Sequence, residues 1–339
     1  MTDPSDRAAQ PSGVPAGAAT GLGPLPGTDI DETLRSVAGE LPVLPFLPQL
    51  ADRGVGADPI GRTLAHLVDI HAEVVPSGWR ICSRPGRDAR RSTDHRSWDA
   101  DAVEQHLAAA SMLKIQLIGP WSLAAGLELP NGHRAVSDHG ATADLAASLA
   151  EGIQLYLADL GRRLPHTRIM VQVDEPELDR VLSGELPTPS GFDTVRSVAI
   201  EIVQRRLGEF RSGLGDRPSM ATGPRSRWNV LRAAGFDRLV CSLDEFAGDT
   251  KALDEIGRTV QDGVQLAVLL GSSSLAVAGR TLLTGWGRIG FAAELLASSV
   301  IPLAGVEDGG PGRPEDIAGA LAIARQLAEA LADPPDSWR

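Results

Sequence analysis

The chain has 339 residues and a formal net charge of −12, from 32 Lys and Arg and 44 Asp and Glu. Because nucleic-acid-binding domains usually carry a basic face, this charge argues against a nucleic-acid partner and against an anionic membrane surface. Hydrophobic residues make up 42% of the chain, which is enough for a sizeable core. The two cysteines, Cys82 and Cys241, exclude a disulfide framework and a cysteine-only zinc cluster. With neither a signal-peptide pattern nor a membrane-spanning apolar run, we expect a cytoplasmic protein.

Residues 1–18 are rich in Pro, Gly, Ala and Ser and show no periodicity, which predicts a disordered lead-in before one domain over 19–335. From Thr20 onward, short apolar runs alternate with helical patterns. The strands are predicted at 20–25, 74–81, 114–119, 168–174, 219–222, 238–243, 264–270 and 300–306. The helices are predicted at 30–39, 59–70, 98–112, 141–163, 192–211, 226–234, 250–262, 281–299 and 314–332.

Eight strands that alternate with helices favour a single (β/α)8 TIM barrel over a doubly wound sheet, which gives the same alternation with fewer strands. The stretch 40–56 interrupts this pattern. It carries Pro42, Pro45 and Pro48, each of which lacks a backbone donor. We therefore expect an extended, Pro-rich insertion after the first strand that acts as a solvent-exposed lid.

Acidic pairs follow several predicted strands, at the end where a barrel places its catalytic groups. The first pair, Asp174 and Glu175, directly follows the apolar run 169–173, and we interpret it as functional. The pairs at 244–245 and 307–308 are interpreted as helix caps or solvated acids.

The glycine-rich segment 21–27 superficially suggests a dinucleotide-binding loop. Its third glycine is one place late, and Pro24 and Pro26 remove amides that a pyrophosphate would need. The sequence therefore argues against NAD binding.

Four segments in chain order resemble the cobalamin-independent methionine synthase family, in its short single-barrel actinobacterial branch. They are TGLGPLPGTD at 20–29, KIQLIGPWS at 114–122, VQVDEPEL at 171–178 and the stretch 305–315. The resemblance covers nearly the whole chain from residue 20. It implies a (β/α)8 barrel that transfers a methyl group from a folate to the thiol of homocysteine, which a zinc ion holds as a thiolate.

The resemblance also locates the residues that would bind zinc. The family's ligand positions are occupied here by Met220, Thr222, Ser242 and Ala304. These residues do not make a zinc site, and Cys241 beside Ser242 would supply only one thiolate. The expectation is therefore that no metal is bound, although zinc is the family's metal and folate its methyl donor.

The implied substrate site is better preserved. The resemblance assigns the substrate's amino group to Asp174, with Glu175 beside it, and the substrate's carboxylate to the backbone at Gly23 and Pro24. The same resemblance places Gly119, Pro120, Trp121 and Ser122 along the site, where Trp121 would offer a stacking face and Ser122 a hydroxyl.

The residues support two hypotheses. The first is a methionine-synthase-like methyltransferase, an S-methyltransferase of homocysteine with an altered or absent metal. The second is a non-catalytic, zinc-less relative that binds an amino-acid-like ligand or a partner protein. A uroporphyrinogen-decarboxylase-type barrel is disfavoured because it would need an arginine-lined cleft, whereas the strand ends here are acidic.

Overall fold

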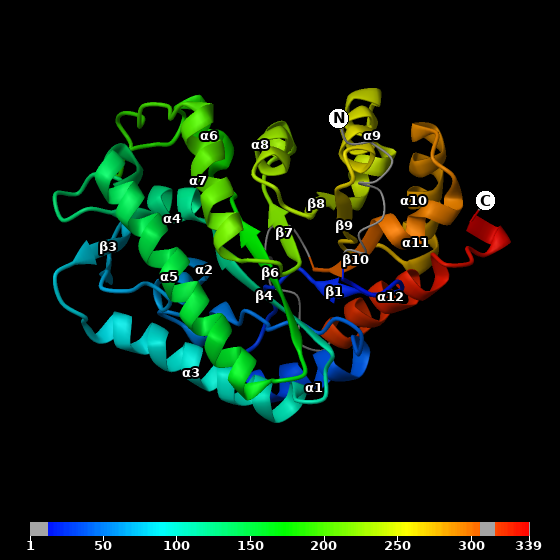
Figure 1. Cartoon of the computed structure of the whole chain (residues 1–339), viewed down its shortest axis with the longest axis horizontal. Coiled ribbons are helices and arrows are strands. Elements are labelled where there is room, and N and C mark those ends of the chain that lie inside the picture. Colours follow the sequence, from blue (N-terminus) through cyan, green and yellow to red (C-terminus); the bar gives the residue numbers. More distant parts are fainter. Residues whose placement is uncertain (1–12, 306–315, 339) are drawn as a thin grey trace.

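The centre of the molecule is a parallel β-sheet surrounded by helices (Figure 1). The computed structural model describes residues 13–305 and 316–338. In spatial order, the strands are β1 (Thr20–Gly21), β10 (Val300–Ala304), β9 (Gln265–Leu269), β8 (Arg238–Ser242), β7 (Ser219–Thr222), β6 (Arg168–Asp174) and β4 (Met112–Ile118). All neighbouring pairs are parallel. The described residues thus form a nearly closed, seven-stranded TIM-like barrel, which confirms the fold in outline but not the expected eight strands.

The Pro-rich stretch 40–56 is part of the barrel wall, so the expectation of an exposed lid is wrong. Phe46 forms a parallel bridge with Lys114 of β4, and Gln49 forms one with Pro24, next to β1. The prolines do not prevent this pairing because the wall uses the N–H groups of Leu47 and Gln49, which donate to the carbonyls of Lys114 and Gly23 at 2.9 Å each. The segment therefore lies in the gap between β1 and β4.

The predicted strand 74–81 is also corrected. It spans the end of β2 (His71–Val75), the turn at 76–77 and most of β3 (Gly78–Cys82), and the two strands form an antiparallel hairpin outside the barrel. Gly78 supplies a backbone φ of +132°, which favours glycine at this tight turn. The short strand β5 (Leu127–Glu128) completes this second, three-stranded sheet.

The helices cover the outside of the barrel (Figure 1). They are α1 (Ile30–Glu40), α2 (Pro59–Leu64), α3 (Arg87–Leu107), α4 (Pro120–Gly126), α5 (His139–Arg163), α6 (Leu178–Ser183), α7 (Ile200–Gly213), α8 (Trp228–Ala233), α9 (Thr250–Gln261), α10 (Leu275–Ile289), α11 (Leu296–Ser299) and α12 (Ile317–Ala330). The first two helices begin after aspartate caps, since Asp29 and Asp58 accept hydrogen bonds from the backbone N–H groups of Glu32 and Gly61. None of the described helices is both long and apolar enough to span a membrane.

Some expected features fall partly or wholly outside the described residues. These are residues 1–12 of the lead-in, the last residue of the strand at 300–306, the acids 307–308 and the start of the helix at 314. Where the lead-in is described, it is packed against the barrel: Ala18 is buried and, with Val14, contacts the cluster that fills the barrel interior.

Strand alternation separates two buried environments. Ile115 and Leu117 of β4 belong to the apolar layer between sheet and helices, whereas Met112 belongs to the interior cluster together with Met170 and Met220. The interior is therefore apolar at the level of the methionines, and the inward-facing positions further along β4 and β6 are polar.

Candidate functional site

A layer of polar side chains fills the barrel above the methionines. It comes from alternate residues of three adjacent strands: Lys114 and Gln116 of β4, Gln172 and Asp174 of β6, and Thr222 of β7. The parallel register pairs Gln116 with Gln172 and Asp174 with Thr222, so these side chains share one face of the sheet. This layer is the candidate site.

Asp174 is fixed at the carboxyl end of β6, where it is only partly buried. Its Oδ1 accepts hydrogen bonds from Gln172 Nε2 and Thr222 Oγ1, each at 2.8 Å. No described residue donates a hydrogen bond to the other oxygen, Oδ2. Burial raises the pKa of Asp174, an effect opposed by the Gln172 hydrogen bond, the charge of Lys114 and the Thr222 hydrogen bond. The geometry thus leaves one carboxylate oxygen available.

Lys114 lies in the layer below and is fully buried. Its Nζ donates to Gln172 Oε1 at 2.7 Å, to Gln116 Oε1 at 3.1 Å and to the Leu22 carbonyl at 3.3 Å. Burial lowers the pKa of Lys114 to about 7, against the opposing charge of Asp174. The three acceptors match the three donors of an ammonium group, so the fold solvates this cation internally.

Sequence reasoning missed Lys114 and Gln116 as site residues. A signal was available, because both occupy alternate positions of an otherwise apolar strand and therefore share one face. Lysine is also almost never fully buried unless it has partners. A lysine inside a strand that is apolar on both sides indicates a polar cluster.

Glu175 points away from the barrel interior and has backbone partners. Its carboxylate accepts the N–H groups of Trp121 at 3.0 Å and Ser122 at 2.7 Å, at the start of α4. Burial raises its pKa to about 7, and the hydrogen bonds to Ser122 and Trp121 oppose the shift. A Cβ at Gly119 would come within 2.4 Å of Glu175 Oε1, so this contact requires glycine there. Glu175 thus joins β6 to α4.

Trp121 and Ser122 are likewise placed in the packing around α4, away from the open Asp174 oxygen. Trp121 is 1% exposed, and its ring lies against Arg206 rather than an open face. The Ser122 hydroxyl accepts the backbone N–H of Glu177 at 3.0 Å. Pro120, the first residue of the helix, is also buried. The expected stacking face and free hydroxyl are therefore not found.

The predicted backbone segment at Gly23 and Pro24 does lie beside the polar layer. The carbonyl of Leu22 accepts from both Lys114 Nζ and Gln172 Nε2. A Cβ on Gly23 would approach Gln116 to 3.0 Å, at a backbone φ of +142°. The Gly23 N–H donates no hydrogen bond to any described residue. Pro24 is exposed.

The residues at the four positions that the resemblance assigns to zinc ligands do not form a metal site. Met220 is buried in the interior cluster, and the Thr222 hydroxyl is bonded to Asp174. Ser242 ends β8, whereas Ala304 packs in the apolar layer between sheet and helices. Among the described residues, no group of three or more His, Cys, Asp or Glu side chains could hold a metal ion. No step through zinc can be derived from these residues.

Comparisons with known proteins give a fold and no family. No protein-family model and no curated protein sequence matches the chain. The solved structure of a B12-independent methionine synthase from Shewanella sp. W3-18-1, in complex with selenomethionine, matches at a TM-score of 0.56 and 11% identity, over 94% of this chain and 98% of that chain. β-Methylaspartase from Clostridium tetanomorphum matches at a TM-score of 0.46 and 10% identity, over 94% of this chain and 59% of that chain, which supports no argument. The chain thus shares a TIM-barrel fold with a methionine synthase.

Proposed function

We propose that the chain is a zinc-independent relative of the methionine synthase barrel that binds the ammonium group of a small amino-acid-like ligand. The observation that carries this proposal is Asp174, whose Oδ1 is held by two donors while Oδ2 receives none from the described residues. A carboxylate fixed in this way is pre-organised for a cation, because its side-chain freedom has already been lost. The partly exposed end of β6 gives a ligand access to it.

The carboxylate of an amino-acid ligand also needs a hydrogen-bond donor. The N–H of Gly23, which donates to none of the residues in 13–305 and 316–338, supplies one beside the same layer, and glycine allows the close approach of a ligand to the backbone. Lys114 is too deeply buried to touch a ligand. It is a positioning residue, whose charge and hydrogen bonds orient Gln172 and, through it, Asp174.

The experiment is calorimetry of the full chain with methionine, homocysteine and the des-amino analogue of methionine. We expect the amino acids to bind and the des-amino analogue not to bind. Asp174→Asn should weaken binding at least about tenfold, because a charge-assisted hydrogen bond is lost. Asp244→Asn is the matched control, since Asp244 is an exposed acid that also follows a strand. Equal binding of the des-amino analogue would refute the proposal.

Methyl transfer from a folate to homocysteine is the second candidate. It is favoured by the full-length likeness to a methionine synthase and disfavoured by the residues at the four ligand positions. The test is formation of methionine from homocysteine and a methylated folate, with and without added zinc. Turnover by the wild type that Asp174→Asn abolishes would make the methyltransferase the better proposal. Binding of homocysteine without formation of methionine would support the first proposal, a zinc-independent binding protein.

A further inference from the structure

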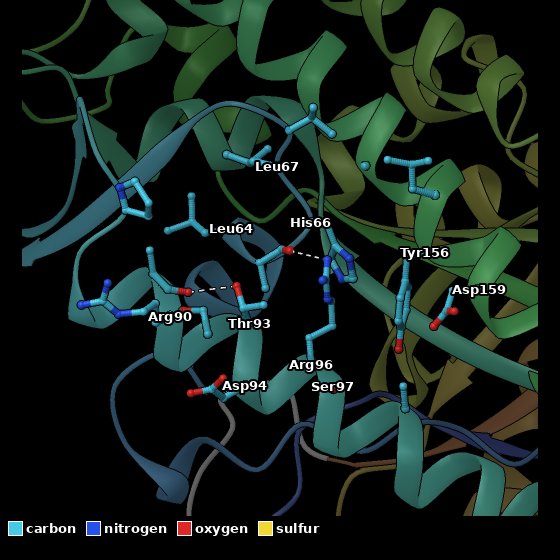
Figure 2. A pocket seen from close by; sticks show the side chains of 18 of the residues that line it. Leu64, His66, Leu67, Arg90, Thr93, Asp94, Arg96, Ser97, Tyr156 and Asp159 are labelled. Atoms are coloured by element: carbon cyan, nitrogen blue, oxygen red, sulfur yellow. Dashed lines mark hydrogen bonds between the residues drawn. The ribbon is translucent and has the colours of Figure 1, made fainter.

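A cavity lies outside the barrel, between α3, α5 and the segment 64–72 that follows α2 (Figure 2). Its volume is about 680 Å³, within the usual range of small-molecule sites. Leu64, Leu67 and Leu155 contribute an apolar wall, and Leu155 is 60% exposed at the rim. The cavity shares no lining residue with the polar layer, so a ligand could bind here whether or not Asp174 has the function proposed for it.

Positive charge dominates the lining, which contains four arginines and two aspartates in a chain of net charge −12. Arg162 and Arg163 are already paired, with Asp159, at 2.8 and 3.0 Å. Arg90 and Arg96 form no ion pair with any described residue. Two guanidinium groups thus face one cavity without a carboxylate partner, and Arg is the side chain best suited to bind oxyanions.

The inner end of the cavity holds further unused hydrogen-bonding groups. Arg96 donates to the Ala65 carbonyl at 2.6 Å through one nitrogen only. Beside it, His66 has a buried Nδ1 without a hydrogen-bond partner, and the imidazole lies 4.6 Å from the ring of Tyr156. The Tyr156 hydroxyl has no hydrogen bond to any described residue. Figure 2 shows Arg96, His66 and Tyr156 grouped on one side of the cavity.

The protonation state of His66 suits an anion-binding role for the arginines. Burial and the charges of Arg96 and Arg62 lower its pKa to about 3, so the imidazole is neutral at physiological pH. A neutral imidazole can donate one hydrogen bond, as the Tyr156 hydroxyl can. The positive charge in this cavity therefore comes from arginine alone.

We propose that this cavity binds a small organic phosphate ester, with its phosphate on Arg96 and its apolar body along Leu67 and Leu155. The unpaired guanidinium of Arg96 matches the phosphate charge, and the terminal oxygens can use the neutral donors of His66 and Tyr156 as well. Arg90, which Figure 2 shows apart from this group, adds positive charge to the lining. An apolar body covers leucine side chains that are otherwise open to solvent.

The test is calorimetry of the full chain with phenyl phosphate, inorganic phosphate and benzyl alcohol as probes. Phenyl phosphate should bind saturably, with a Kd of about 0.1–1 mM. Inorganic phosphate should bind more weakly, and benzyl alcohol, which lacks the charge, should not bind. Arg96→Gln should weaken phenyl phosphate binding about tenfold, as expected for the loss of a charged partner. Tyr156→Phe, which removes only the hydroxyl, should weaken it by a smaller factor.

Arg91→Gln is the matched control, because Arg91 is exposed on the same helix and does not line the cavity. It should leave the Kd unchanged, and so should Asp174→Asn in the barrel. Absence of saturable phenyl phosphate binding would overturn the proposal. An equal effect of Arg91→Gln would overturn it too, since general surface charge would then explain the binding. Loss of binding in Asp174→Asn would assign the phosphate to the barrel instead.

Discussion

The buried ammonium group of Lys114 should make the stability of the protein depend on pH in a defined window. The pKa of Lys114 is lowered from 10.5 to about 7 in the folded chain. Between these values the unfolded state binds more protons than the folded state, so the free energy of unfolding rises with pH. Below pH 7 the ammonium is buried at full cost, and above 10.5 neither state carries the charge.

The size of the effect is set by the two pKa values. At 1.36 kcal/mol per pKa unit, the total gain is about 5 kcal/mol, with a slope of at most about 1.4 kcal/mol per pH unit. Lys114→Met keeps a side chain of similar length and removes the titrating group. The difference in unfolding free energy between wild type and Lys114→Met should therefore change with pH above 7, in favour of the wild type, while other titrations cancel in the comparison.

Two measurements test this reasoning, and the composition of the chain simplifies both. Chemical denaturation at a series of pH values gives the difference between the variants. Since Lys114 and Lys251 are the only lysines, NMR of the protein labelled at the lysine ε-carbon gives two signals, and that of Lys114 should titrate near pH 7. Lys251 is exposed and serves as the internal control, with Lys251→Met as the control variant. A Lys114 signal that titrates near 10.5, or a stability difference that is flat above pH 7, would refute the argument.

Three substitutions test the packing. Phe46→Ala should cost about 3–5 kcal/mol, because the ring is fully buried in the barrel wall. Asp99→Asn should cost about 3–5 kcal/mol, since the buried carboxylate of Asp99 holds the guanidinium groups of both Arg53 and Arg62. Trp338→Ala should cost about 3 kcal/mol, as this residue near the C-terminus is 5% exposed. Denaturant unfolding measures all three.

Each of these losses has a control at an exposed position. Phe192→Ala and Trp98→Ala remove rings that are 96% and 56% exposed, and both should stay within about 0.5 kcal/mol of the wild type. Asp94→Asn, on the same helix as Asp99, should be equally neutral. If Phe46→Ala left the free energy of unfolding unchanged, the Pro-rich stretch would be an exposed lid, as its sequence suggests, and not part of the barrel wall.

The parallel barrel was predictable because its strands are mostly apolar and are bounded by turn residues. The runs at 168–174 and 219–222 have the bounds that the structure gives them, since a strand buried from both sides carries few polar residues. The Pro-rich wall was not predictable in the same way. Proline removes a donor, but only alternate N–H groups of 45–49 are needed for pairing, and the sequence alone does not show which ones the neighbouring strands use.

Within the candidate site, residue type was predictable and side-chain direction was not. Asp174 and Glu175 are adjacent acids at one strand end, and alternation sends them to opposite faces of the sheet. One meets Thr222 in the barrel, and the other meets the N–H groups that open α4. The resemblance assigns both residues to ligand binding. In this structure Glu175 instead joins the end of β6 to the start of α4.

The same alternation places Thr222, at a position that the resemblance assigns to a zinc ligand, beside the Asp174 carboxylate. Thr222, which occupies a position that the resemblance gives to a zinc ligand, donates its hydroxyl to Asp174 Oδ1. A zinc-binding thiolate or imidazole there would change both the charge and the hydrogen bonding of this carboxylate. The threonine hydroxyl present in this chain is instead a neutral donor that keeps Asp174 oriented. Thr222, which is not a typical zinc ligand, thus helps to order the carboxylate on which the proposed ammonium site depends.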